Sequence, residues 1–135
     1  MQQNFLRFAI GKYWEKLYTK LRNKEGQVLE TKYKKEDKLL IIKLQEDIDH
    51  NLSEKIRRRL DYEIQRYIPR KVIFDFTNIG FMDSAGIGLI IGRYKLVTML
   101  GGSMCIRVAN KNVSKILEMS GIMKIMPVEY SKQAI

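Results

Sequence analysis

The order of apolar and polar residues at the start of the chain predicts one helix followed by two strands. Residues 4–24 carry apolar side chains at helical spacing, with several lysines and arginines on the remaining positions. Residues 28–34 alternate apolar with polar side chains, and residues 38–44 contain a short apolar run. Both patterns are typical of strands, and we expect a charged turn to join them.

The next segment predicts a helix and then a buried strand. Residues 51–67 place their apolar side chains on one stripe, and Pro69 ends the predicted helix. Asn51 and Glu54 resemble a capping box at its start. Residues 72–76 are rich in strand-forming residues, as expected of a central strand that is buried on both faces.

The remainder of the chain continues to alternate helices with strands. We predict a helix over residues 84–100, closed by two glycines, a strand over 104–108, a short helix over 113–120 and an edge strand over 125–128. Strands that alternate with helices pair in parallel, because a crossover helix returns the chain to the same edge of the sheet. The fold class is therefore α/β, and the opening strand pair makes the sheet mixed, with four to five strands.

Length and composition fit one domain with a short appendage. The chain has 135 residues, of which 45% are hydrophobic and 30% are charged, as in ordinary globular proteins. Gly26 is a natural boundary, so we assign residues 1–26 to a basic amphipathic helical extension and residues 27–135 to the domain. No apolar run reaches the about 20 residues that cross a bilayer. With a single cysteine, Cys105, and no recognisable signal peptide, the chain is expected in the cytoplasm.

The strong positive charge raises the question of a polyanionic partner. The formal net charge is +10, which suits nucleic acid, acidic membrane surfaces or an acidic protein. The aromatic residues among the basic ones do not form a regular ladder, so we expect no direct nucleic-acid binding. The extension over residues 4–24 could dock on a partner, a second copy or a membrane surface, or it could cover one face of the domain's own sheet.

Residues that would support catalysis are scarce. One histidine, His50, and one cysteine cannot form a metal site, and we expect no cofactor and no enzymatic activity. The adjacent acids Glu46 and Asp47 are interpreted as surface charge. Gly86, Gly88 and Gly92 invite comparison with a dinucleotide-binding loop, but that motif requires glycines in the turn directly after a strand.

One segment at the end of the central strand remains a candidate site. It contains Asp83, Ser84 and Ala85 and leads into the long predicted helix. Either Asp83 or Ser84 could cap the first amide groups of that helix. Spacing alone favours a simple helix start, although a serine exposed there is also accessible to a kinase.

Three stretches of the chain resemble the bacterial anti-sigma factor antagonists of the STAS domain family. The first is DFTNIGFMDSAGIG at residues 75–88, which continues through IGRYK at residues 91–95. The second is ILEMSGI at residues 116–122, and the third is LQEDIDHN at residues 44–51. The resemblance implies a mixed sheet with helices packed mainly on one face. Glu46 stands where the family usually has glycine, and Ala85 replaces a frequent second serine.

The resemblance also implies a regulatory function. The unmodified protein would bind an anti-sigma factor that is itself a nucleotide-bound serine kinase, and so release a sigma factor. That kinase would phosphorylate Ser84, and a phosphoserine phosphatase would restore binding. The residues expected to contact the partner are Asp49, His50, Met82, Asp83, Ser84, Ala85, Gly86, Ile87, Gly88 and Arg93.

Two alternatives stay open at this point. A STAS module can instead regulate a membrane transporter or a lipid-transport complex, and the basic extension favours that alternative. A small nucleotide-binding protein built on the glycine-rich segment is the other.

Overall fold

The computed structural model describes residues 28–131, and the helix predicted over residues 4–24 lies outside them. The elements follow one another as strand, strand, helix, strand, helix, strand, helix, 3₁₀ turn and strand. Their bounds are β1 (Leu29–Lys34), β2 (Leu39–Leu44), α2 (His50–Tyr67), β3 (Lys71–Phe76), α3 (Ser84–Met99), β4 (Ser103–Val108), α4 (Lys111–Ser120), η1 (Ile122–Lys124) and β5 (Val128–Tyr130). The predicted alternation of strands and helices is confirmed.

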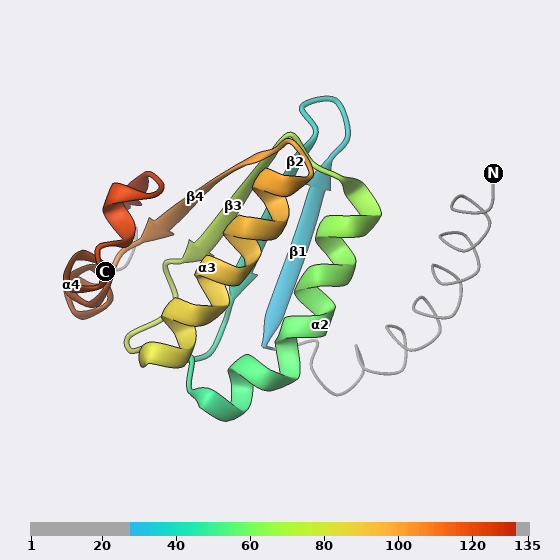
Figure 1. Cartoon of the computed structure of the whole chain (residues 1–135). Coiled ribbons are helices and arrows are strands. Elements are labelled where there is room, and N and C mark those ends of the chain that lie inside the picture. Colours follow the sequence, from blue (N-terminus) through green and yellow to red (C-terminus); the bar gives the residue numbers. More distant parts are fainter. Residues whose placement is uncertain (1–27, 132–135) are drawn as a thin grey trace.

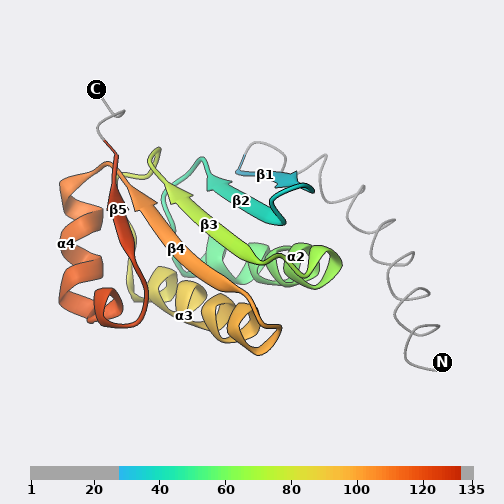
Figure 2. The same ribbon diagram turned by 90° about the horizontal axis from the view of Figure 1, so that it is seen from above.

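The five strands form one mixed sheet in the order β1-β2-β3-β4-β5. The tight turn between β1 and β2 makes that pair antiparallel, whereas each later strand follows a helix and pairs in parallel. Helices α2 and α3 cover one face of the sheet, and α4 lies at its β5 end (Figures 1 and 2). The predicted fold class, with helices mainly on one face, is confirmed.

The core lies between the sheet and helices α2 and α3. Alternate residues of β2, β3 and β4 point into it, as the two-residue period of a strand requires. The apolar stripes of the helices meet them, and each large side chain buried in this way stabilises the fold by about 1.5–3 kcal/mol. The central members are Leu40, Ile42, Phe74, Phe76, Ile106, Val108, Ile56, Leu60, Ile64, Leu89, Ile90 and Val97, all of them buried.

A row of charged residues crosses the opposite face of the sheet. Glu30, Lys43, Asp75, Arg107 and Glu129 are successive partners in the registers of the five strands. Their charges alternate in sign from one edge strand to the other. Arg107 lies 3.9 Å from the carboxylate of Asp75 and 3.7 Å from that of Glu129. We refer to these five residues as the charge ladder.

Two predicted boundaries were wrong. Helix α2 begins at His50, and its cap is Asp49, whose side chain accepts a hydrogen bond from Leu52 N at 2.8 Å, in place of the expected capping box. The last strand covers Val128–Tyr130, later than the predicted residues 125–128. The strand begins later because Pro127 has no N–H to donate to a neighbouring strand. Its carbonyl accepts a hydrogen bond from Ile106 N at 3.0 Å, and regular pairing follows from Val128 onward.

We expect the domain to fold without its extension. Among the residues that the structure describes, the buried core residues lie between Leu29 and Met126, and the sheet and helices α2 and α3 supply the two sides of that core. Deleting residues 1–26 should therefore leave a single cooperative thermal transition, measured by near-ultraviolet circular dichroism beside the full-length chain. A truncated chain that binds hydrophobic dyes and melts without a transition would show that the extension belongs to the core.

Candidate functional site

Two loops meet at the C-terminal ends of the parallel strands, where α2 and α3 begin (Figure 1). They are residues 45–49, after β2, and residues 77–83, after β3. A parallel bridge joins them: Ile48 N donates to Phe81 O at 3.3 Å, and Asp83 N donates to Ile48 O at 3.2 Å. The bridge continues the pairing of β2 with β3 beyond the strand ends, at the edge where α/β proteins usually bind their ligands.

Side chains of the first loop hold the second loop in place. The carboxylate of Asp47 accepts hydrogen bonds from Gly80 N at 2.8 Å and from Phe81 N at 3.2 Å. The amide oxygen of Gln45 accepts from Asn78 Nδ2 at 2.7 Å. Asp47 is thus more than the surface charge that its sequence context indicated. Its contacts lie 33 and 34 residues away, so no local pattern could reveal them.

Asp83 is the cap of α3, which leaves Ser84 outside the capping contacts. The Asp83 carboxylate accepts from Ala85 N at 2.8 Å and from Gly86 N at 3.4 Å. Of the two caps that the sequence allowed, the structure selects Asp83. Ser84 is the first residue of the helix and is exposed. Its hydroxyl therefore lies on the surface at the positive end of a helix dipole.

The start of α2 is attached to the start of α3. The hydroxyl of Ser53, in the first turn of α2, donates a hydrogen bond to Ala85 O at 3.3 Å. His50, the first residue of α2, is exposed beside its cap Asp49. The N-termini of α2 and α3, with Ser84 at the start of α3, thus lie beside each other at the surface.

Gly86 packs closely against the Met82 side chain beneath this surface. A Cβ at this position would lie 3.1 Å and 3.2 Å from atoms of the Met82 side chain, closer than ordinary contacts allow. A Cβ on Gly88 would meet nothing within 4 Å, so Gly88 is not required sterically. The first glycine lets α3 begin directly over the bridged loops, and the second leaves an open patch of backbone.

The structure sorts the predicted contact residues into three groups. Asp49, His50, Ser84 and Gly88 are exposed, whereas Asp83, Ala85 and Ile87 are partly exposed. Met82 and Gly86 are buried beneath them. Arg93 is buried elsewhere, so neither it nor the two residues beneath the loop belongs to the accessible surface.

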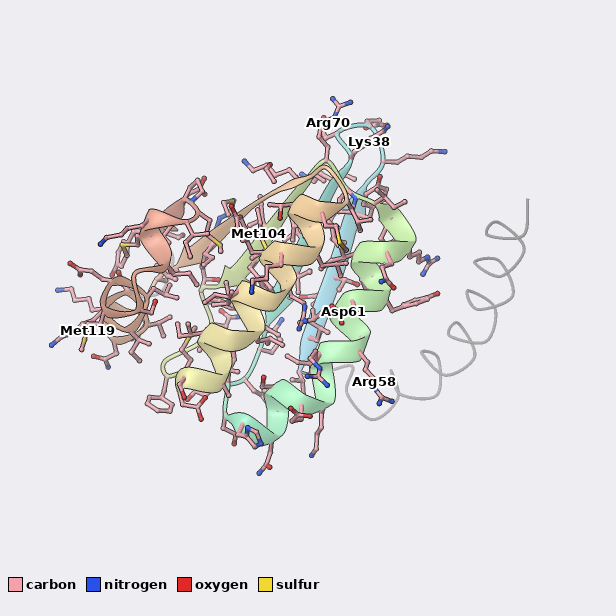
Figure 3. The ribbon with its side chains drawn as sticks, in the orientation of Figure 1. Lys38, Arg58, Asp61, Arg70, Met104 and Met119 are labelled. Atoms are coloured by element: carbon pink, nitrogen blue, oxygen red, sulfur yellow. The ribbon has the colours of Figure 1, made fainter. Side chains whose placement is uncertain are left out.

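Arg93 connects the two helices to each other. It is only 7% exposed, and its Nε lies 2.8 Å from Oδ1 of Asp61, which points from α2 toward α3 (Figure 3). Burial lowers the pKa of Arg93 although Asp61 opposes this, and burial raises the pKa of the Asp61 carboxyl although Arg93 and Arg57 oppose it. Desolvation is thus the largest effect on both partners, as is common for buried pairs. The pair is thus a buried charged contact between α2 and α3.

One exposed residue of the site was not singled out by the sequence pattern. Phe81 is 52% exposed, although Ile79 and Met82 on either side of it in the same loop are buried. An apolar residue in a loop otherwise predicts burial, so only the structure distinguishes Phe81 from its neighbours.

The described residues offer little for catalysis. Among residues 28–131, no group of three His, Cys, Asp or Glu side chains is placed to hold a metal ion. Cys105 is buried in β4, and burial raises the pKa of its thiol, which disfavours a reactive thiolate. No helix within the same range is both long and apolar enough to cross a membrane.

Comparison with known proteins identifies relatives of the chain. The family model described as the STAS domain matches residues 30–135. The anti-sigma F factor antagonist of Paenibacillus polymyxa is 41% identical over 90 residues, which cover 67% of this chain and 77% of that protein. The anti-sigma F factor antagonist of Lysinibacillus sphaericus is 27% identical over 96 residues, which cover 71% of this chain and 82% of that protein.

Solved structures share the fold. The anti-sigma factor antagonist SpoIIAA in its unphosphorylated form matches with a TM-score of 0.65 and 24% identity, over 78% of this chain and 91% of that chain. The phosphorylated form of SpoIIAA, described as a Bacillus cell fate determinant, matches with a TM-score of 0.59 and 24% identity, over 78% and 95% of the two chains.

The Asp61–Arg93 pair gives a test of how the helices are held. We expect Arg93→Ala to lower the free energy of unfolding by about 1–3 kcal/mol, less than for a fully buried pair because the Asp61 side chain is 34% exposed. Replacing both partners, Asp61→Leu with Arg93→Met, should restore most of this loss, because no charge is left buried. Urea unfolding at neutral pH measures both effects. A double variant that is no more stable than Arg93→Ala would show that the loss does not come from an unpaired buried charge.

Proposed function

The chain belongs to the STAS domain family, as its motifs predicted, and we propose that it is an anti-sigma factor antagonist switched by phosphorylation of Ser84. In its unmodified form it binds an anti-sigma factor and so releases a sigma factor. The anti-sigma factor is a nucleotide-bound serine kinase that modifies Ser84 and ends the interaction, and a phosphoserine phosphatase restores it. The chain itself acts by binding and not by catalysis.

The observation that carries this proposal is the position of Ser84. It is exposed, it begins α3, and it lies at the edge of the sheet where the two bridged loops meet. The residues beside it on the surface, Ala85 and Gly88, are small. A kinase can reach the hydroxyl, and the backbone of a partner can approach closely.

Phosphorylation at this position is expected to change binding and not folding. A phosphate adds about −1.5 to −2 charges and three acceptor oxygens. The N-terminus of a helix tolerates negative charge, with a favourable contribution of about 0.3–1 kcal/mol. Because Asp83 makes the capping hydrogen bonds, the helix start stays intact. The contact surface, however, becomes bulky and strongly hydrated.

The relatives support the partner class. Two of them are named as antagonists of anti-sigma F factor, and they match most of the domain. SpoIIAA, which shares the fold, occurs in an unphosphorylated and a phosphorylated form. Both facts agree with a switch that operates through an anti-sigma factor.

The geometry argues against the nucleotide-binding alternative. Phosphate-binding helix N-termini present free N–H groups to the ligand. Here the N–H groups of Ala85 and Gly86 donate to the Asp83 carboxylate, so they are not free for a phosphate ligand. Gly86 packs against Met82 and does not line an open loop. Membrane regulation depends on residues 4–24, so it stays a prediction.

Substitutions of Ser84 test the switch. We expect Ser84→Ala to change the free energy of unfolding by no more than about 0.5 kcal/mol, because Ser84 does not cap the helix. This variant should bind the anti-sigma factor and resist inactivation by ATP. Ser84→Asp should fold normally and bind at least about 10-fold more weakly. Calorimetry with the anti-sigma factor of the same organism measures the affinities, and mass spectrometry locates the phosphate.

Ser103→Asp is the matched control. Ser103 is also exposed, but it begins β4 and so lies at the N-terminal ends of the parallel strands, away from Ser84. This variant should bind like the unsubstituted chain. Phosphate found at Ser53 or Ser103 and not at Ser84, together with full binding by Ser84→Asp, would refute the proposed switch.

A further inference from the structure

We propose that Phe81 is the aromatic anchor of the interaction with the anti-sigma factor, that Asp47 holds this anchor in position, and that the partner receives the ring in an apolar socket. The inference rests on the proposed function and deepens it, because it assigns the affinity of the site to a residue other than the one that is switched.

The exposure of Phe81 is the first argument. Half of this large apolar residue is exposed, although Ile79 and Met82 in the same loop are almost completely buried. The core therefore takes up the other apolar side chains of the loop and leaves this one on the surface. Exposed aromatic residues near the centre of a contact surface are typical of binding hot spots.

The rigidity of its backbone is the second argument. Phe81 N donates to Asp47 Oδ1 at 3.2 Å, and Phe81 O accepts from Ile48 N at 3.3 Å. The preceding Gly80 N also donates to Asp47 Oδ1, at 2.8 Å. A ring on a backbone held from both sides loses little conformational freedom when it binds, so more of its contact energy appears as affinity.

The position of Phe81 close to Ser84 indicates that both residues contact the same partner. Phe81 lies three residues before Ser84, in the loop that leads into α3, and the bridge to Ile48 joins that loop to the loop after β2. A stable interface covers about 800 Å² of each partner. A protein that covers Ser84 over such an area also covers Phe81. The ring and the serine hydroxyl therefore face the same molecule, the anti-sigma factor.

The first experiment replaces the ring in the full-length chain. Phe81→Ala should bind the anti-sigma factor of the same organism at least about 30-fold more weakly by calorimetry. Its thermal unfolding should remain cooperative, because half of the residue is already in water. Tyr130→Ala is the matched control: Tyr130 is an aromatic residue of β5 that is 53% exposed, and its loss should leave the affinity within about threefold.

The second experiment tests the positioning role of Asp47. Asp47→Ala should weaken binding about 5-fold to 10-fold when Phe81 is present, and should have almost no further effect in the Phe81→Ala background. Asp47→Asn keeps an acceptor oxygen for Gly80 N and Phe81 N, so it should bind like the unsubstituted chain. A merely structural role of Asp47 would weaken both backgrounds equally.

The outcomes separate this inference from the proposed function. If Phe81→Ala binds within about threefold of the unsubstituted chain while Ser84→Asp does not bind, the anchor is refuted and the switch stands. If neither substitution changes binding, this surface is not the interface and both proposals fail. If Phe81→Ala abolishes self-association in sedimentation and leaves the anti-sigma factor affinity unchanged, the ring serves a second copy and the inference is wrong.

Discussion

The parallel bridge between Ile48 and Met82 is the interaction on which the functional surface depends. It joins the loops that follow β2 and β3, and so fixes where α2 and α3 begin. Without it, the two helix starts would be connected at this edge only by side chains such as Ser53. The sheet thus extends its own hydrogen bonding to the residues that meet a partner, and the binding surface inherits the rigidity of the core.

The site also separates structural from regulatory tasks among neighbouring residues. Asp83 satisfies the first amide groups of α3, and Gly86 allows the close packing beneath it. Ser84, which lies between them, neither caps the helix nor packs beneath it. A residue without a structural role can be modified without loss of the fold, which is the physical requirement for a reversible switch.

Much of the fold follows from local periodicity, whereas the site depends on contacts between distant segments. The two-residue and helical patterns locate the strands and helices to within a few residues, because burial on one face enforces them. They misplace the last strand, where Pro127 shifts the pairing, and they cannot separate buried Arg93 from exposed residues of α3. Asp47 and Phe81 owe their positions to the other loop, so only the folded arrangement reveals what they do.

The charge ladder has a consequence for how the strands find their partners. A slip of one residue between neighbouring strands is already excluded by the hydrophobic alternation, because it would turn every core side chain toward water. A slip of two residues preserves that alternation, so the same side chains would still face the core. Between β3 and β4, for example, such a slip in one direction would set Arg107 beside Ile73 and separate it from its counter-charge Asp75. The charge ladder therefore favours one strand register over those that differ from it by two residues. Hydrophobic burial does not distinguish these registers, because each of them keeps the same side chains in the core.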